Sequence, residues 1–299
     1  MQDGSPTLQG KVAVVTGATS GLGRWAAYFL AAAGATTVVV GRGEDRVAEA
    51  VKEIAGGSRN PDVAGIPVTD LALRAETARV ARTLLERYPR IHLLVNNAGA
   101  VLLKRQETAE GLERTFALNV LSPFLLTTLL ASRLEASAPS RVVMVASAAH
   151  RGQSVHLDDL EGRTRYRGWT AYGRSKLELI LLAREFSRRL QPRGVRVNAL
   201  HPGFVASGFG KNNGGLAGAT IGFLSHAFGR SVSDAGADVA YVASSPSLEN
   251  VSGVYLDKRK IHPGSPASHD LAVAGRLYDA CLERVAGFVP DPPASVGST

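Results

Sequence analysis

The sequence predicts an α/β fold, in which a doubly wound, Rossmann-like parallel sheet of seven strands lies between two layers of helices. Short apolar runs rich in β-branched residues alternate with segments of helical spacing along most of the chain. A glycine-rich turn over residues 16–23 joins the first apolar run to the first helix. A length of 299 residues with 45% hydrophobic content suffices for one large buried core.

The predicted elements alternate regularly between strand and helix. The expected strands cover residues 11–16, 36–40, 63–68, 91–95, 141–146, 195–200 and 251–255. The expected helices cover residues 22–33, 46–54, 74–88, 110–134, 172–190, 234–244 and 271–285. Strands that alternate with helices in this way specify a parallel sheet with right-handed crossovers.

One domain is expected over residues 9–287, after a polar leader at 1–8. The tail 288–299 is rich in proline and small residues, so we expect it to be disordered. Two long segments, 148–170 and 204–232, are expected to be substrate loops, and the glycines and phenylalanines of the second are typical of a mobile lid.

Composition favours a cytoplasmic protein. A single cysteine, Cys281, excludes an intrachain disulfide, and no uninterrupted apolar run reaches the ~18 residues that a membrane span needs. The formal net charge is +8, but the basic residues are scattered, so we expect a polyanionic small ligand rather than nucleic acid. No cluster has the spacing of a metal site, and His150, His156 and His201 are expected to be loop or structural residues.

The turn from Thr16 to Gly23 has the features of a phosphate-binding loop. Its three glycines allow a tight turn, close approach of the backbone to a pyrophosphate, and packing of the helix on the strand. The amino terminus of the helix offers free N–H groups and a partial positive charge. Such a turn can also be a plain connection, so the interpretation depends on the residues at the other strand ends.

Tyr172 and Lys176 are four residues apart and therefore share one face of their helix. A cation within ~4 to 6 Å favours the phenolate, and a pKa two or three units below ~10 requires about 3 to 4 kcal/mol. Ser147 ends the fifth strand, where its hydroxyl could bind a substrate oxygen. Asn119 is a polar residue inside a helix. Taken singly, each of these could be an ordinary helix or turn residue.

Together, the motifs resemble the short-chain dehydrogenase/reductase family, with matching order and spacing over about residues 10–255. They are Thr-Gly-x-x-x-Gly-x-Gly at 16–23, Asn-Asn-Ala-Gly at 96–99, Asn119, Ser147, Tyr-x-x-x-Lys at 172–176 and Pro-Gly at 202–203. Ser-Ala-Ala-His-Arg-Gly at 147–152, Asp-Asp-Leu at 158–160 and Ala-Leu-His-Pro-Gly at 199–203 are similar to the retinol dehydrogenase-like branch.

The resemblance implies a role for each residue of the site. Tyr172 is the implied proton donor and acceptor, Lys176 lowers its pKa and binds the nicotinamide ribose, Ser147 orients the carbonyl, and Asn119 holds a water of the proton relay. The implied cofactor contacts are Gly17, Thr19, Ser20, Gly21, Leu22, Gly23, Asp70, Leu71, Asn97, Ala98, Gly99, Tyr172, Lys176, Pro202, Gly203, Val205 and Ser207. Asp70 would meet the adenine ring through its carboxylate or the neighbouring backbone.

Charge at the end of the second strand favours NADP(H) over NAD(H). An NAD site places Asp or Glu there, which would repel a 2′-phosphate. Here Gly41 occupies that point and Arg42 follows it, with Arg24 and Arg46 as helpers. The acidic residues 44–45 lie beyond the expected position and can start the next helix.

The sequence therefore predicts an NADP(H)-dependent oxidoreductase that transfers a hydride between nicotinamide and a carbonyl or a primary or secondary alcohol. Trp169 and the phenylalanines of 204–232 favour an apolar, adaptable substrate pocket, with simple packing of the lid as the alternative. One alternative is an enzyme that reduces a C=C or C=N bond or performs another step on a natural product. Another is a sensor that binds NADP without turnover. Substrate identity and reaction direction stay open, and a homodimer is implied only by the resemblance.

Overall fold

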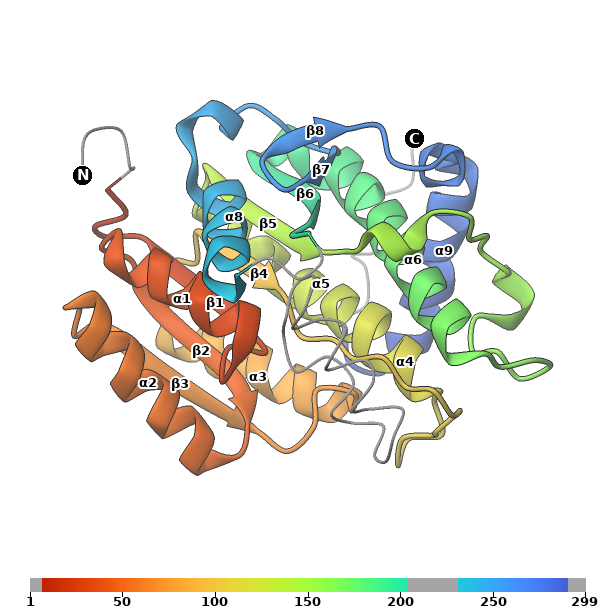
Figure 1. Cartoon of the computed structure of the whole chain (residues 1–299), viewed down its shortest axis with the longest axis horizontal. Helices are drawn as coiled ribbons and strands as arrows, with labels where there is room; N and C mark the ends of the chain where they lie inside the picture. The colour runs from red at the N-terminus through yellow and green to blue at the C-terminus, as the bar shows by residue number, and fades with distance from the viewer. Residues whose placement is uncertain (1–6, 204–230, 290–299) are drawn as a thin grey trace, which may run out of the picture.

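All strands that the structure describes belong to one eight-stranded sheet in the order β3-β2-β1-β4-β5-β6-β7-β8 (Figure 1). The computed structural model describes residues 7–203 and 231–289. The strands are β1 (Val12–Thr16), β2 (Thr36–Arg42), β3 (Val63–Val68), β4 (Leu93–Asn96), β5 (Ser140–Val145), β6 (Val195–His201), β7 (Tyr255–Asp257) and β8 (Lys260–His262). Val14 of β1 pairs in parallel with Val38 of β2 on one side and Leu94 of β4 on the other.

Helices cover both faces of the sheet and give the three predicted layers (Figure 1). They are α1 (Gly21–Ala32), α2 (Glu44–Ser58), α3 (Arg74–Arg87), α4 (Arg114–Phe116), α5 (Ser122–Ala136), α6 (Gly168–Leu190), α8 (Val232–Ser244) and α9 (Leu271–Val285). Helices α1, α2 and α8 bury their apolar faces in one core, and α3, α5, α6 and α9 bury theirs in the other. The predicted Rossmann-like α/β fold is confirmed.

The far edge of the sheet differs from the prediction of seven parallel strands. The last parallel strand, β7, begins only at Tyr255 and not at residue 251 as predicted. The chain turns before it at Gly253, whose φ is +75°. The eighth strand, β8, runs antiparallel to β7 after a two-residue turn in which Lys258 has a φ of +58°. Its three residues lack an apolar pattern, which is why the sequence did not predict it.

Three helix boundaries also differ from the prediction. The expected helix over 110–134 consists of α4, a π-helical segment Ala117–Leu121, and α5. Helix α6 begins at Gly168, so Tyr172 lies one turn inside it. Helix α2 continues through the two glycines at 56–57 and ends at Ser58, followed by the C-cap residue Arg59, whose φ is +57°.

Parts of the leader, of the second substrate loop and of the tail lie outside the described residues. These parts are 1–6 of the leader, 204–230 of the second substrate loop with Val205 and Ser207, and 290–299 of the tail.

The run Arg114–Ala136 has the length and hydropathy of a membrane span, although polar residues interrupt its apolar sequence. In the structure 72% of its apolar window is buried inside the protein, where Phe124 and Leu130 are part of the core. Its hydrophobicity is therefore accounted for by packing, and the cytoplasmic location stays a prediction.

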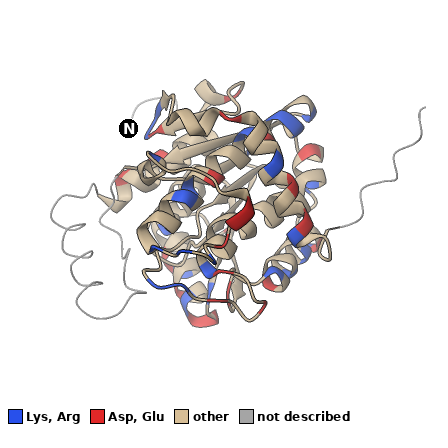
Figure 2. Ribbon diagram, turned by 90° about the vertical axis from the view of Figure 1, so that its right-hand side faces the viewer, with Lys and Arg blue, Asp and Glu red and all other residues tan. Residues whose placement is uncertain are grey.

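Charged residues of both signs are interspersed over the elements that Figure 2 presents. Several acidic and basic side chains pair across elements, such as Arg74 with Glu110 and Arg193 with Glu135.

Candidate active site

The glycine turn after β1 packs against the Asn-Asn-Ala-Gly segment after β4. The Thr16 hydroxyl accepts hydrogen bonds from the backbone N–H groups of Asn97 (3.0 Å) and Ala98 (3.1 Å). The Asn97 amide donates in return to the Thr16 carbonyl at 2.8 Å. A Cβ on Gly17 would lie 2.9 Å from Ala98 Cα, and one on Gly23 would lie 2.5 Å from the Gly17 carbonyl oxygen. Only glycine therefore fits at these two positions.

The amino terminus of α1 is left open to an anion. Its N-cap residue, Ser20, makes no side-chain capping bond, and the first turn of the helix contains no acidic residue. Gly21 has a φ of +57°, which gives the turn its left-handed step. Free N–H groups and the positive end of the helix dipole thus face the carboxyl edge of the sheet, as a pyrophosphate requires.

Arg42 lies at the end of β2, beside the glycine turn. Gly41 permits this approach, because a Cβ there would overlap the Thr19 methyl group. The Arg42 side chain is exposed and, within residues 7–203 and 231–289, forms no ion pair. Arg24, expected as a helper, is instead paired with Glu53 of α2. Arg42 is thus the better placed of these two guanidinium groups for a 2′-phosphate.

Asp70 follows β3, but its carboxylate already has protein partners. One oxygen accepts from Arg114 Nη2 at 2.5 Å and the other from the Ala72 backbone N–H at 3.0 Å. The neighbouring Leu71 is buried. Both contacts considered for this position, through the carboxylate or the backbone, stay predictions.

Tyr172, Lys176 and Ser147 come together at the carboxyl ends of β5 and β6. The Ser147 side chain hydrogen-bonds the Tyr172 side chain. Lys176 Nζ donates to the Val145 carbonyl at 2.8 Å and lies 5.6 Å from the centre of the Tyr172 ring. Tyr172 is 6% exposed and Lys176 is 4% exposed, so the groups interact in a largely dry environment.

The pKa of Tyr172 departs from the expectation that Lys176 lowers it. Burial raises this pKa to about 12, and the hydrogen bond with Ser147 acts in the opposite direction. Burial also lowers the pKa of Lys176 to about 8, which reduces the preference of this amine for its charged form. In the protein alone, desolvation of the phenol thus outweighs its hydrogen bond with Ser147.

Asn119 lies in the π-helical segment between α4 and α5, a distortion common at functional sites. Its Oδ1 accepts from the Ala100 N–H at 2.9 Å, and its Nδ2 lies 3.0 Å from both the Ala100 carbonyl and Ser175 Oγ. A Cβ on Gly99 would lie 3.1 Å from Asn119 Oδ1 and 3.4 Å from Lys176 Nζ. The amide therefore joins the segment after β4 to α6, and its role toward a water stays a prediction.

One residue of the site, Ser175, was not identified from the sequence. It accepts from Asn119 and donates to the Tyr172 carbonyl at 2.7 Å. A hydroxyl directly before Lys176 was the available signal. Pro202 and Gly203 follow β6 at the same edge, and Gly203 has a φ of +89°.

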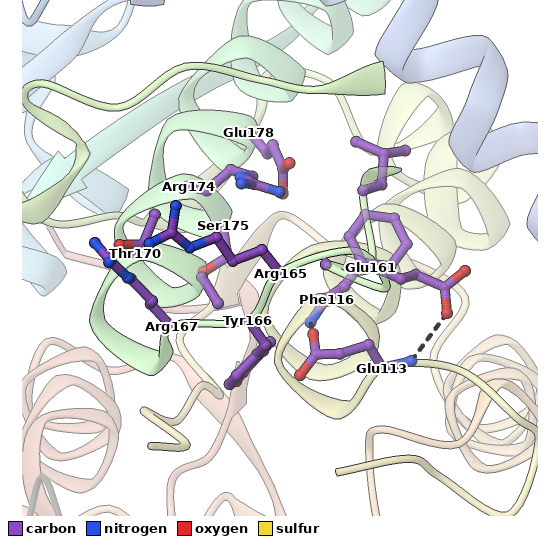
Figure 3. Close-up of a pocket in the computed structure, with 13 residues that line it drawn as sticks. Glu113, Phe116, Glu161, Arg165, Tyr166, Arg167, Thr170, Arg174, Ser175 and Glu178 are labelled. Atoms are coloured by element: carbon purple, nitrogen blue, oxygen red, sulfur yellow. Dashed lines mark hydrogen bonds between the residues drawn. The ribbon is translucent and has the colours of Figure 1, made fainter. Parts of the chain in front are cut away.

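A small cavity of about 20 Å³, enough for a water molecule, lies beside helix α6 (Figure 3). Ser175 and Glu178 line it from α6, and Tyr166 and Glu113 line it from other segments. Glu178 is 1% exposed, and its Oε1 has no hydrogen-bond partner in the described structure. Burial raises the pKa of Glu178 to about 8.

No group of three His, Cys, Asp or Glu side chains within the described ranges could hold a metal. His150 is fully buried inside the protein. A glycine turn open to an anion and a buried Ser-Tyr-Lys group at the same sheet edge define an oxidoreductase of the dinucleotide-binding α/β class.

The chain belongs to the short-chain dehydrogenase family, whose model matches residues 11–214. It is 36% identical to human retinol dehydrogenase 13 over 277 residues, 91% of this chain and 83% of the relative. It is 39% identical to mouse polyprenol dehydrogenase over 280 residues, with the same coverage. These similarities place it in the retinol dehydrogenase-like branch.

Solved structures agree with this assignment. An uncharacterized protein from Mycobacterium paratuberculosis has a TM-score of 0.73 and 27% identity, over 95% of this chain and 97% of its own. The complex of Pseudomonas aeruginosa RhlG with NADP has a TM-score of 0.69 and 26% identity, over 86% and 97%. A gluconate 5-dehydrogenase from Beutenbergia cavernae with bound NADP has a TM-score of 0.65 and 30% identity, over 84% and 96%.

Proposed function

We propose that this protein is an NADP(H)-dependent oxidoreductase that interconverts an apolar carbonyl compound and the corresponding primary or secondary alcohol, with Tyr172 as the acid and base. The observation that carries the proposal is the hydrogen bond between Ser147 and Tyr172, with Lys176 buried beside them. A site that only bound a dinucleotide would not need this arrangement of a phenol, a hydroxyl and an amine.

When bound, NADP(H) would supply the hydride to the carbonyl carbon or accept it from the alcohol carbon. In the direction of reduction, Tyr172 donates its phenol proton to the carbonyl oxygen as the C–H bond forms, and the phenolate is reprotonated from solvent. A pKa of about 12 keeps the phenol protonated at neutral pH, as a donor requires, but makes it a weaker acid than an unperturbed tyrosine. Ser147 can hydrogen-bond the same carbonyl oxygen, and Lys176 can stabilise the phenolate once it forms.

Three features of the chain fit NADP(H). The glycine turn packs so closely against Asn97 that a Cβ on Gly17 or Gly23 would collide with the Asn97 side chain. Helix α1 has an uncapped amino terminus, and Arg42 is exposed at the end of β2. A guanidinium can bind a 2′-phosphate through two hydrogen bonds. The related RhlG and gluconate 5-dehydrogenase structures contain NADP, which supports the same choice here.

An apolar substrate is supported by Trp169. This side chain is 53% exposed on the first turn of α6, and its ring stands edge-on to Tyr172 with 6.4 Å between centroids. An exposed tryptophan beside the catalytic phenol offers an apolar surface to a substrate. The relatives named for retinol and polyprenol are consistent with a long apolar alcohol.

The test is NADPH oxidation with a panel of apolar aldehydes, ketones, enones and imines, including retinal. We expect turnover of aldehydes or ketones that falls at least a hundredfold in Tyr172→Phe, while NADPH binding is kept. Full activity of Tyr172→Phe would contradict the assigned acid. Turnover of enones or imines alone would favour the alternative reaction, and NADPH binding without any turnover would favour the sensor.

A further inference from the structure

His150 is buried at 0% exposure three residues after Ser147, on the short turn Ala148–His150. Its Nδ1 lies 2.7 Å from the Ser147 carbonyl oxygen, and the backbone N–H of Ser265 donates to its Nε2 at 3.1 Å. A carbonyl can only accept and a backbone N–H can only donate. The partners therefore fix the neutral tautomer that carries its proton on Nδ1.

The segment that meets Nε2 is shaped for this contact. Gly264 has a φ of +82°, and a Cβ there would lie 2.7 Å from Ser268 Oγ and 3.5 Å from His150 Nε2. Ser268, itself fully buried, donates to the Ser265 carbonyl at 2.6 Å. The backbone N–H of Ser265 is thus held toward the imidazole by a turn that only glycine can form.

The imidazole ring is also fixed by packing. The Tyr255 ring of β7 stands edge-on to it with 4.9 Å between centroids, and Tyr255 is fully buried. Strand β7 lies beside β6 at the edge of the sheet where Figure 1 shows β8. Residues 255–268 lie beyond the 11–214 match to the family model, so a part of the chain outside that match holds His150.

On its Nδ1 side, the His150 imidazole contacts the backbone of Ser147. The Ser147 carbonyl accepts from both the His150 backbone N–H, at 3.2 Å, and the imidazole Nδ1. The side chain of the same Ser147 hydrogen-bonds Tyr172. The imidazole therefore fixes the peptide plane from which the Ser147 hydroxyl extends toward the reacting atoms.

We propose that His150 is a positioning residue for hydride transfer: through its two ring nitrogens it ties the Gly264–Ser265 turn to the Ser147 carbonyl and so holds the Ser147 hydroxyl against Tyr172. The proposal rests on the proposed function, because it assigns His150 a role only through Ser147 and Tyr172. A displacement of a reacting group by about 1 Å can lower a rate a hundredfold, so loss of this tie should affect kcat.

Two variants separate the two hydrogen bonds. In His150→Asn, the amide can still donate to the Ser147 carbonyl but cannot reach Ser265. In His150→Gln, the longer amide can accept from the Ser265 N–H but leaves the Ser147 carbonyl without its side-chain donor. His92 provides the matched control, since it is 4% exposed and also accepts a backbone N–H, from Val12 at 3.0 Å, near the start of β1.

The experiment measures kcat, KM and the free energy of unfolding for the Asn and Gln variants at both histidines. We expect His150→Gln to lose roughly ten- to a hundredfold in kcat with its KM for NADPH unchanged. His150→Asn, which keeps the donor to the Ser147 carbonyl but loses the bond to Ser265, should lose less kcat than His150→Gln. Both His92 variants should lose stability but keep kcat.

Wild-type kcat in His150→Gln, or an equal loss of kcat in His92→Gln, would overturn the positioning role. If either result were found while Tyr172→Phe still lost its kcat, the proposed function would stay intact. Full activity of Tyr172→Phe, or no turnover by the wild type, would instead overturn the proposed function and this inference together.

Discussion

The Lys176 ammonium nitrogen donates a hydrogen bond to the backbone carbonyl of Val145, 2.8 Å away at the last residue of β5. Ser147 lies two residues beyond Val145 and hydrogen-bonds Tyr172. One buried amine therefore connects the catalytic helix α6 to the strand that leads to Ser147, besides lying next to the phenol.

Replacement of Lys176 by methionine is expected to lower kcat by about a hundredfold or more, since the phenolate that forms in reduction loses its nearby cation. The apolar stem of methionine fills much of the same buried space, so the fold should persist. Steady-state kinetics with an unfolding curve for each protein checks this. Lys176→Met with wild-type kcat would contradict a role of the amine in the reaction.

Arg42→Ala is expected to raise the KM for NADPH roughly ten- to a hundredfold with little change in kcat, because a charge-assisted contact to the 2′-phosphate is lost. The KM for NADH should stay nearly constant, so the ratio of the two kcat/KM values reports the effect.

Arg24→Ala is the control for this measurement. Its guanidinium is paired with Glu53, and we expect a smaller change in cofactor preference. An unchanged preference in Arg42→Ala, or a larger change in Arg24→Ala, would show that Arg42 is not the phosphate ligand.

Gly23→Ala is expected to destabilise the protein by about 1–3 kcal/mol and to weaken NADPH binding. The added Cβ would lie 2.5 Å from the Gly17 carbonyl oxygen, and backbone atoms cannot move aside as a flexible side chain can. Gly56→Ala is the matched control, because no atom lies within 4 Å of its added Cβ and it should stabilise α2 by up to about 1 kcal/mol. Equal effects of both changes on unfolding and NADPH affinity would contradict the close packing of the turn.

The fold and most of the site could be predicted because their signals are local. Val12–Thr16 and the glycines after it form a strand and a turn from short-range preferences, and the same holds for the four-residue spacing of Tyr172 and Lys176. The strand ends then bring Ser147 to Tyr172, as a parallel sheet requires. The prediction of the family from these motifs is confirmed by the match over residues 11–214.

Features that depend on tertiary contacts could not be predicted. The π-helical turn at Asn119 is set by its bonds to Ala100 and Ser175, and helix periodicity contains no sign of it. The short edge strand β8 pairs only because β7 is beside it. The high pKa of Tyr172 follows from burial, which the spacing to Lys176 does not reveal.

Glu178 gives the protein a dependence of stability on pH. Burial raises the pKa of this carboxyl from 4.5 to about 8 in the folded state. Between about pH 4.5 and 8, the unfolded chain releases the proton that the folded protein keeps, so the free energy of unfolding falls as the pH rises. The slope from this group is at most about 1.4 kcal/mol per pH unit.

Glu178→Gln removes that dependence, so its stability relative to the wild type should increase from pH 5 to 8 and level off above. Glu185, on the same helix, is the control with the opposite sign: hydrogen bonds from Arg188 and Arg189 lower its pKa. The stabilisation that Glu185 gives the folded protein is present above pH 4.5 and is lost at lower pH, so Glu185→Gln should be destabilising at pH 7. Urea unfolding from pH 5 to 9 measures both, and a constant difference between Glu178→Gln and the wild type would mean that this carboxyl is already ionised in the folded protein.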